Sequence, residues 1–287
     1  MLLRFPQAID ICDDNVLQSA NLPIARYRQA TAAGRRTSFI TEHTLLFVLQ
    51  GHKLLHFGNQ TYTAEAGHLL FMKRGIYTLS EFVPDGLDYE VLLLFFTDDF
   101  LKKFLYAYGF TTTQAVTAGA HLVLPSTALL DSFKTQFMSY FGKRIEGLEN
   151  ILQLKQQELL LLLLSGAQRQ QVLEFLQGIV FGQPLDVGYI VKTHLFQPLT
   201  LEELARLSGR SLASFKRDFQ QQFRCPPKKW INQQRLAHAR MLLHHTNKQV
   251  AEIALECGFE NIPHFIRIFR QEYGITPNAD RARKAIV

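Results

Sequence analysis

The stretch ECGFENIPHFIRIFR, residues 256–270, decides how the last third of the chain folds. A helix with apolar periodicity ends at Gly258, and Pro263 predicts the start of another helix, because proline suits the first helical turn. Phe265 and Phe269 are four residues apart and therefore share one face of that second helix. The stretch predicts two short helices joined by a tight turn.

The same unit occurs twice in the chain. LEELARLSGRSLASFKRDFQQQF (201–223) aligns with VAEIALECGFENIPHFIRIFRQEY (250–273). Each copy has alanine in its first helix, glycine in the turn and two phenylalanines one turn apart in its second helix. In a helix-turn-helix, one helix braces the next in the major groove of DNA. Two copies joined by a long helix therefore predict a DNA-binding domain, with basic residues opposite the phenylalanines: Lys216, Arg217, Arg267 and Arg270.

Charge is unevenly distributed along the 287 residues. The formal net charge is +6, yet residues 196–287 alone carry 15 Lys/Arg and 8 Asp/Glu, and the rest of the chain is close to neutral. A basic segment on a near-neutral body indicates a polyanionic partner. Together with the repeated unit, this charge predicts double-stranded DNA as the partner.

Residues 38–96 predict a series of short strands. Apolar runs alternate with turn signals at spacings of about 8–12 residues, which is typical of an all-β sandwich or barrel. The pair Gly58-Asn59 suits a tight hairpin. The apolar runs could wall a site for a small effector, although the sequence singles out no polar residue inside it.

Beyond Thr97 the pattern becomes helical, and it predicts a pair of helices at 126–141 and 149–164. The second helix is apolar on every side near its end, so every side must be covered. The strands can cover one side, and either a second copy of the chain or the neighbouring helix can cover the other. We expect a homodimer formed through four leucines of this helix: Leu152, Leu159, Leu160 and Leu163.

Three further features place the chain in the cytoplasm, away from membranes. The longest apolar run, 159–164, is far shorter than the roughly 20 residues that a spanning helix needs. Three widely separated cysteines without metal spacing indicate a reducing compartment. The first 15 residues lack the apolar core of a signal peptide.

Glycines and prolines after residue 177 predict a boundary between two domains. We expect a regulatory and dimerisation domain at 1–177, a linker at 178–184 and a DNA-binding domain at 185–287.

The C-terminal third resembles the AraC/XylS family of transcriptional regulators, through LARLSGRSLASFKRDF, RLAHARMLL, VAEIALECGF, HFIRIFR and GITP. The resemblance implies an all-α domain of seven helices with two helix-turn-helix units. The strands ahead of it resemble the cupin-like β-barrel that many members carry, and the helical pair resembles the one with which they dimerise. The implied fold class is therefore α+β, with a cupin-like barrel and dimerisation pair followed by the all-α domain.

A narrower resemblance connects the chain to members that activate type III secretion genes, through LLFMKRGIYTLS, LKQQELLLLLLSGAQ and WINQQRLAHARMLL. In that subgroup an anti-activator protein, rather than a small ligand, governs the N-terminal domain. The family mostly activates by touching RNA polymerase beside the promoter. The resemblance implies an activator with RNA polymerase as a partner, controlled by an anti-activator protein or a small effector. A small-molecule-binding cupin sensor that represses is the alternative.

The DNA contacts of the family carry over by position. In the first unit they fall on the second helix, where Lys or Arg can bond guanine and Ala can meet a thymine methyl group. The predicted contacts of this unit are Ala213, Ser214, Lys216 and Arg217.

The second unit departs from the family, which usually has small polar residues at the base-facing positions. Here these positions hold Ile262, Pro263, Ile266 and Arg267, and of the four only Arg267 can hydrogen-bond from its side chain. We expect this unit to position the DNA by holding phosphates. Its predicted contacts are His264, Arg267 and Arg270.

A cupin-like barrel can also be a metalloenzyme that gathers histidines and an acid around one metal. Four histidines are close in sequence here, yet no His-x-His occurs, and no nucleophile–base motif, phosphate loop or dinucleotide fingerprint is present. We predict a protein that is not an enzyme, with no catalytic residue, metal ligand or cofactor. The histidines in question are His43, His52, His56 and His68.

Overall fold

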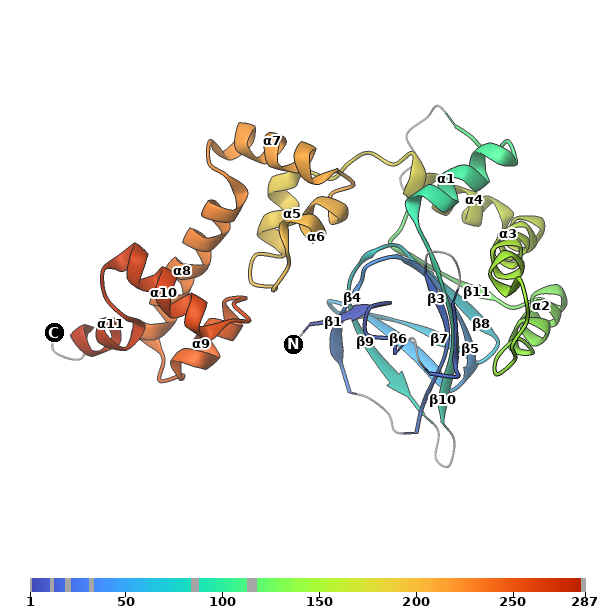
Figure 1. Cartoon of the computed structure of the whole chain (residues 1–287), viewed down its shortest axis with the longest axis horizontal. Helices are drawn as coiled ribbons and strands as arrows, with labels where there is room; N and C mark the ends of the chain where they lie inside the picture. The colour runs from blue at the N-terminus through green and yellow to red at the C-terminus, as the bar shows by residue number, and fades with distance from the viewer. Residues whose placement is uncertain are drawn as a thin grey trace. The chain divides into compact units, whose positions relative to one another are not determined.

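The computed structural model describes residues 2–10, 13–18, 22–30, 34–83, 88–112 and 118–284. The chain divides into two compact units, a first, N-terminal unit (Leu3–Gln183) and a second, C-terminal unit (Pro184–Val287). The first unit combines strands with helices, whereas the described part of the second unit is helical (Figure 1). The mixed organisation that the sequence predicts is confirmed at this level.

The described strands of the first unit are β1 (Leu3–Phe5), β2 (Val16–Gln18), β3 (Pro23–Gln29), β4 (Arg36–Ile40), β5 (His43–Gln50), β6 (His52–Phe57), β7 (Gln60–Glu65), β8 (His68–Met72), β9 (Gly75–Phe82), β10 (Tyr89–Phe96) and β11 (His121–Pro125). They form two sheets, with the orders β1-β4-β9-β6-β7 and β11-β8-β5-β10-β3-β2. The pairing among these strands does not close into one barrel. Of the two folds that the turn spacing allows, the described ladders resemble the sandwich more closely than the closed barrel.

The central strands of the six-stranded sheet are buried on both faces. Successive side chains of a strand point to opposite faces, so Leu45 and Phe47 of β5 pack on one side while Leu46 and Val48 pack on the other. Strands β8 and β10 divide their apolar residues in the same way. This double burial explains why these strands read as continuous apolar runs.

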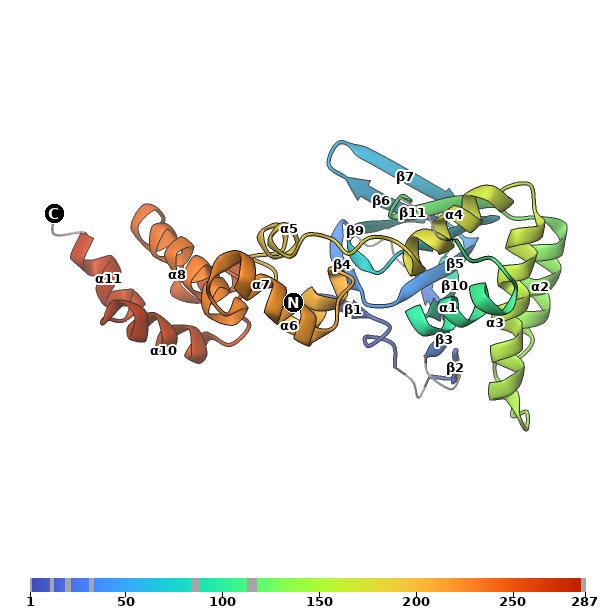
Figure 2. The ribbon, with the colours of Figure 1, turned by 90° about the horizontal axis from the view of Figure 1, so that it is seen from above.

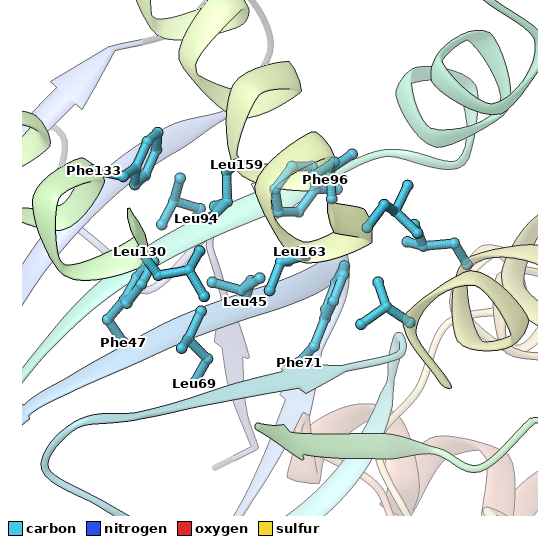
Figure 3. Packing of buried hydrophobic residues seen from close by; sticks show 14 of the residues in the cluster. Leu45, Phe47, Leu69, Phe71, Leu94, Phe96, Leu130, Phe133, Leu159 and Leu163 are labelled. Atoms are coloured by element: carbon cyan, nitrogen blue, oxygen red, sulfur yellow. The ribbon is translucent and has the colours of Figure 1, made fainter. Parts of the chain in front are cut away.

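Helices cover the outer face of the six-stranded sheet. They are α1 (Asp98–Ala107), α2 (Ala128–Met138), α3 (Leu148–Ser165) and α4 (Arg169–Val180). Leu130 and Phe133 of α2, and Leu159 and Leu163 of α3, lie over the strand side chains (Figure 3). Helices α2 and α3 lie side by side, as the sequence predicts for a helical pair (Figure 2).

Helix α3 buries the four leucines predicted to form a dimer. Leu152, Leu159 and Leu160 are 0% exposed and Leu163 is 4% exposed. Gln156 is buried among them and donates a hydrogen bond to the Phe95 carbonyl oxygen at 3.0 Å. The structure therefore assigns these leucines to the core of one chain, which is the alternative that the sequence left open.

The second unit consists, in its described part, of α5 (Val187–Thr193), α6 (Leu201–Leu207), α7 (Leu212–Phe223), α8 (Pro227–His245), α9 (Val250–Glu256), α10 (Ile262–Tyr273) and α11 (Pro277–Lys284). These are the seven helices that the family resemblance implies. The segment 178–184 begins inside α4, and Asp186 caps α5 by accepting from the Tyr189 amide at 2.6 Å. No helix in the described ranges is long and apolar enough to cross a membrane.

Candidate nucleic-acid interface

Each helix-turn-helix unit starts with a capped first helix. The Glu203 carboxylate accepts from the Thr200 amide at 2.8 Å, and the Thr200 hydroxyl accepts from the Glu203 amide at 3.2 Å. In the second unit the Glu252 carboxylate accepts from the Gln249 amide at 2.8 Å. These bonds satisfy amides that the first turn of a helix leaves unpaired.

The turn of each unit requires glycine. Gly209 has a φ of 73° and Gly258 has a φ of 82°, a conformation that side chains disfavour. Gly258 is also approached closely, since a Cβ there would lie 2.8 Å from the Phe196 carbonyl oxygen. The second turn therefore tolerates no side chain at this position.

Paired phenylalanines pack the second helix of each unit on its first helix. Phe215 and Phe219 in α7, and Phe265 and Phe269 in α10, are all 0% exposed. Burying each ring stabilises the fold by roughly 1.5–3 kcal/mol. The packing that the four-residue spacing predicts is confirmed in both units.

The two second helices expose equivalent faces. Residues 211–220 and 261–270 pass through the same order of exposed, half-buried and buried positions. In both helices this order exposes matching positions, namely 213, 216, 217 and 220 of α7 and 263, 266, 267 and 270 of α10. A pair of matched faces is the geometry that two recognition helices need.

The predicted contacts of the first unit lie together on α7. Ala213, Lys216 and Arg217 are exposed, and Ser214 is half-buried. The Arg217 guanidinium is 3.3 Å from the Ser214 hydroxyl and 3.4 Å from the Asp218 carboxylate. The arginine is thus oriented by its neighbours while its side chain stays 75% exposed.

The predicted contacts of the second unit lie together on α10. Arg267 and Arg270 are exposed, and Arg267 Nη2 is 3.0 Å from Nδ1 of the half-buried His264. Pro263 is exposed and Ile266 is 37% exposed, beside the arginines. The remaining apolar position of this face, 262, packs partly against the core.

A buried arginine of the long helix α8 connects the two units. Arg235 donates to the carbonyl oxygens of Leu195 (2.7 Å), Gln197 (2.6 Å) and Gly258 (2.9 Å). Its guanidinium also lies over the Phe259 ring. Burial lowers the pKa of Arg235 to about 10, which leaves it charged at neutral pH. One side chain therefore ties the segment before α6 to the turn of the second unit.

The last helix is held by a buried carboxylate. Asp280 of α11 is 2% exposed and accepts from Arg240 at 3.1 and 3.2 Å and from His244 at 2.9 Å. Both partners belong to α8. Helix α8 therefore supports both helix-turn-helix units and the C-terminal helix α11.

The N-terminal unit (Leu3–Gln183) contains a cavity of about 50 Å³ between its sheets, with a mostly apolar wall and a few polar and charged groups. Glu81 is ion-paired there with Lys53 and, at 2.9 Å, with Arg36. Three buried oxygen atoms that line this cavity have no hydrogen-bond partner in the described part of the chain, namely Ser38 Oγ, Glu81 Oε2 and the Tyr89 hydroxyl. Burial raises the pKa of Tyr89, so its hydroxyl keeps its proton.

Three of the four strand histidines have separate structural partners, whereas Nδ1 of His68 is buried without a hydrogen-bond partner in the described part of the chain. His43 is 4% exposed, lies 2.8 Å from the Asp98 carboxylate and accepts from the Arg74 amide. His56 lies between two hydroxyl groups, and His52 contacts a phenylalanine ring. Across the ranges that the structure describes, no three His, Cys, Asp or Glu residues are grouped to hold a metal ion.

The class of protein is defined by two family models that match different parts of the chain. The C-terminal match, residues 204–283, is described as a helix-turn-helix domain. The N-terminal match, residues 43–175, is described as the ExsA N-terminal regulatory domain. Together with the paired units, these matches define a DNA-binding transcriptional regulator.

Known relatives extend over almost the whole chain. The virulence regulon transcriptional activator VirF of Yersinia enterocolitica is 26% identical over 271 residues, which are 92% of this chain and 98% of VirF. The regulator ExsA of Pseudomonas aeruginosa is 23% identical, over 85% of this chain and 87% of ExsA. A structure of apo ToxT from Vibrio cholerae aligns over 92% of this chain and 98% of its own, with 13% identity and a TM-score of 0.45. The chain belongs to the AraC/XylS family, and the narrower resemblance to members that activate type III secretion genes is confirmed.

The sequence did not identify Arg235 or the cavity residues as important. Arg235 is one of many basic residues in the C-terminal third, and nothing local shows that it is buried. The cavity residues could have been found from strand alternation, because Lys53 shares its face with Leu55, and Glu81 shares its face with Leu79.

Replacing Arg235 with Met should destabilise the C-terminal unit by about 3 kcal/mol or more, because one buried and two partly buried carbonyl groups lose their donor. Urea unfolding followed by the fluorescence of Trp230 measures this, since the only tryptophan of the chain lies in α8. Lys229→Met, on an exposed residue of the same helix, is the control and should change the midpoint little. Equal midpoints for both variants would contradict the bridging role of Arg235.

Proposed function

We propose that the protein is a sequence-specific activator of transcription that binds double-stranded DNA through α7 and α10. The observation that carries this proposal is the matched pair of exposed faces on two equally built helix-turn-helix units. The name of VirF, a virulence regulon activator, supports activation rather than repression. The proposed targets are virulence genes, including those of type III secretion, with RNA polymerase as the partner at the promoter and the cytoplasm as the site of action.

We propose that the two helix-turn-helix units have different roles in binding DNA. Lys216 and Arg217 of α7 are long, exposed donors that can reach the O6 and N7 atoms of guanine. On α10, Arg270 lies near the end of the helix, one turn beyond Arg267, where it suits a phosphate. The first unit therefore reads sequence, and the arginines of the second mainly fix the position of the duplex.

Lys216→Ala or Arg217→Ala should reduce the preference for specific over random DNA, because each deletes a base contact. Arg270→Ala should weaken binding to both DNAs and reduce the slope of log affinity against log salt by about 1. Fluorescence anisotropy at several salt concentrations, with a duplex selected from the source genome and a shuffled duplex, measures both effects. Equal losses on the two duplexes for all three variants would contradict these different roles.

We also propose that the protein forms a homodimer through the exposed side of α3. A surface groove of about 410 Å³ runs along this side. Leu154, Leu161, Leu162 and Tyr108 form its apolar part, and Gln157, Glu158 and Ser165 complete its lining. Leu154 is 66% exposed, and these leucines are separate from the buried set of the same helix. An exposed apolar strip on a helix suits a partner helix with the same surface.

Leu154→Glu should shift the protein from dimer to monomer, because a carboxylate would be buried at the interface. Light scattering measures the mass, and circular dichroism checks that the fold persists. Leu129→Glu is the matched control, since Leu129 is 62% exposed on the neighbouring helix α2, outside the groove. A Leu154→Glu variant that is folded and still dimeric would rule out this face.

For the control of activity we propose a small effector in the cavity between the sheets of the N-terminal unit, with an anti-activator protein as the alternative. Arg36 and Lys53 exceed the charge of Glu81 by one, so the cavity favours a monoanion. Ser38 and Tyr89 have hydroxyl groups to donate, and Glu81 has an oxygen to accept. A two- or three-carbon hydroxy acid has a carboxylate and a hydroxyl group that match these partners.

Glycolate or lactate should therefore raise the melting temperature of the protein. Tyr89→Phe should abolish this rise without lowering the melting temperature of the free protein, because it removes a buried hydroxyl that has no partner. Differential scanning fluorimetry with acetate as the comparison anion measures both effects. If neither glycolate nor lactate shifts the melting temperature of the wild type, the hydroxy-acid effector is rejected, and a protein that co-purifies with the chain would favour the anti-activator.

A further inference from the structure

The recognition face of α10 has an apolar edge that hydrogen bonding to DNA does not explain. Ile266 is 37% exposed, and Pro263, one turn earlier, is exposed as well. A single exposed apolar side chain is ordinary on a protein surface and indicates nothing alone. These two residues, however, are neighbours on one face, next to Arg267 and Arg270.

The position of Ile266 in the unit gives this edge its meaning. It corresponds to Lys216 of the first unit, because the order of exposed and buried positions is the same in α7 and α10. In both helix-turn-helix units the paired phenylalanines belong to the same core cluster as buried residues of the bracing helix. At the position where α7 presents the ammonium group of Lys216 to the bases, α10 presents a branched aliphatic side chain.

The major groove offers few groups that such a side chain can recognise. Guanine, cytosine and adenine present hydrogen-bond donors and acceptors there, whereas thymine adds its C5 methyl group. An aliphatic side chain gains free energy by burying a methyl group and loses it by covering an unpaired donor or acceptor. Ile266 therefore favours a T·A pair over a G·C pair at the position that it faces.

We infer that Ile266, with Pro263 beside it, reads thymine methyl groups and gives the second unit a sequence preference of its own. This inference rests on the proposed DNA-binding function and assigns the chemistry of its second half-site. Arg267 and Arg270 still hold the backbone, so the unit combines a phosphate clamp with an apolar reader. The first unit prefers hydrogen-bonding base edges, and the second prefers methyl groups.

Deoxyuridine tests the inference, because it pairs with adenine as thymidine does and lacks only the methyl group. A selected duplex is prepared with uracil in place of thymine in one half of the site, and then in the other half. For wild-type protein, each contacted methyl group that is removed should weaken binding about fourfold. In the half that faces α10, Ile266→Ala should reduce this sensitivity, because alanine and Pro263 leave a smaller apolar surface, while sensitivity in the other half remains unchanged.

Leu255→Ala is the matched control, since Leu255 is 57% exposed on α9 and is not on the recognition face. This variant should keep the full penalty for uracil. A wild-type protein that binds all the duplexes equally, or an Ile266→Ala variant that keeps the wild-type penalty in both halves, would overturn the inference. Either result leaves the proposed function intact if the selected duplex is still preferred over random DNA, whereas loss of that preference in the wild type would reject the function itself.

Discussion

The C-terminal unit (Pro184–Val287) depends on the buried guanidinium of Arg235, which donates to carbonyl groups from two segments that are distant in the sequence. Leu195 and Gln197 precede the first helix-turn-helix, and Gly258 lies in the turn of the second. A buried charge and buried carbonyl groups are each costly without partners, so neither segment can move away without cost to the other. Helix α8 thereby sets the spacing and orientation of the two recognition faces. The carboxylate of Asp280 in turn fixes the last helix, α11, to α8.

The two helix-turn-helix units share one scaffold and differ at their edges. The glycine turns, capped first helices and buried phenylalanines form the scaffold, and none of them contributes to the recognition face. The face can therefore change from Lys216 to Ile266 without loss of packing. This separation of packing from recognition lets one architecture present hydrogen-bond donors in one unit and aliphatic groups in the other.

In the N-terminal unit (Leu3–Gln183), too, the residues that pack the core are separate from the charged and polar groups that line the cavity. Its six-stranded sheet is covered by helices on one face, and the leucines of α3 are used within the chain. The space between the sheets holds an ion-paired group of charged side chains and unpaired oxygen atoms rather than a fully apolar filling. Such groups reduce stability unless something binds them, so their presence is consistent with a regulatory role.

The sequence by itself determined the helix-turn-helix units and the residues on their faces. The determining signals are local: apolar periodicity, a glycine turn and a four-residue phenylalanine spacing all lie within one stretch such as 250–273. Only the tertiary structure decided which leucines of α3 are buried, because a helix that is apolar on every side has no periodicity to read. It alone also showed the burial of Arg235 and brought Ser38, Glu81 and Tyr89 together from three strands, since these depend on contacts between residues far apart in the chain.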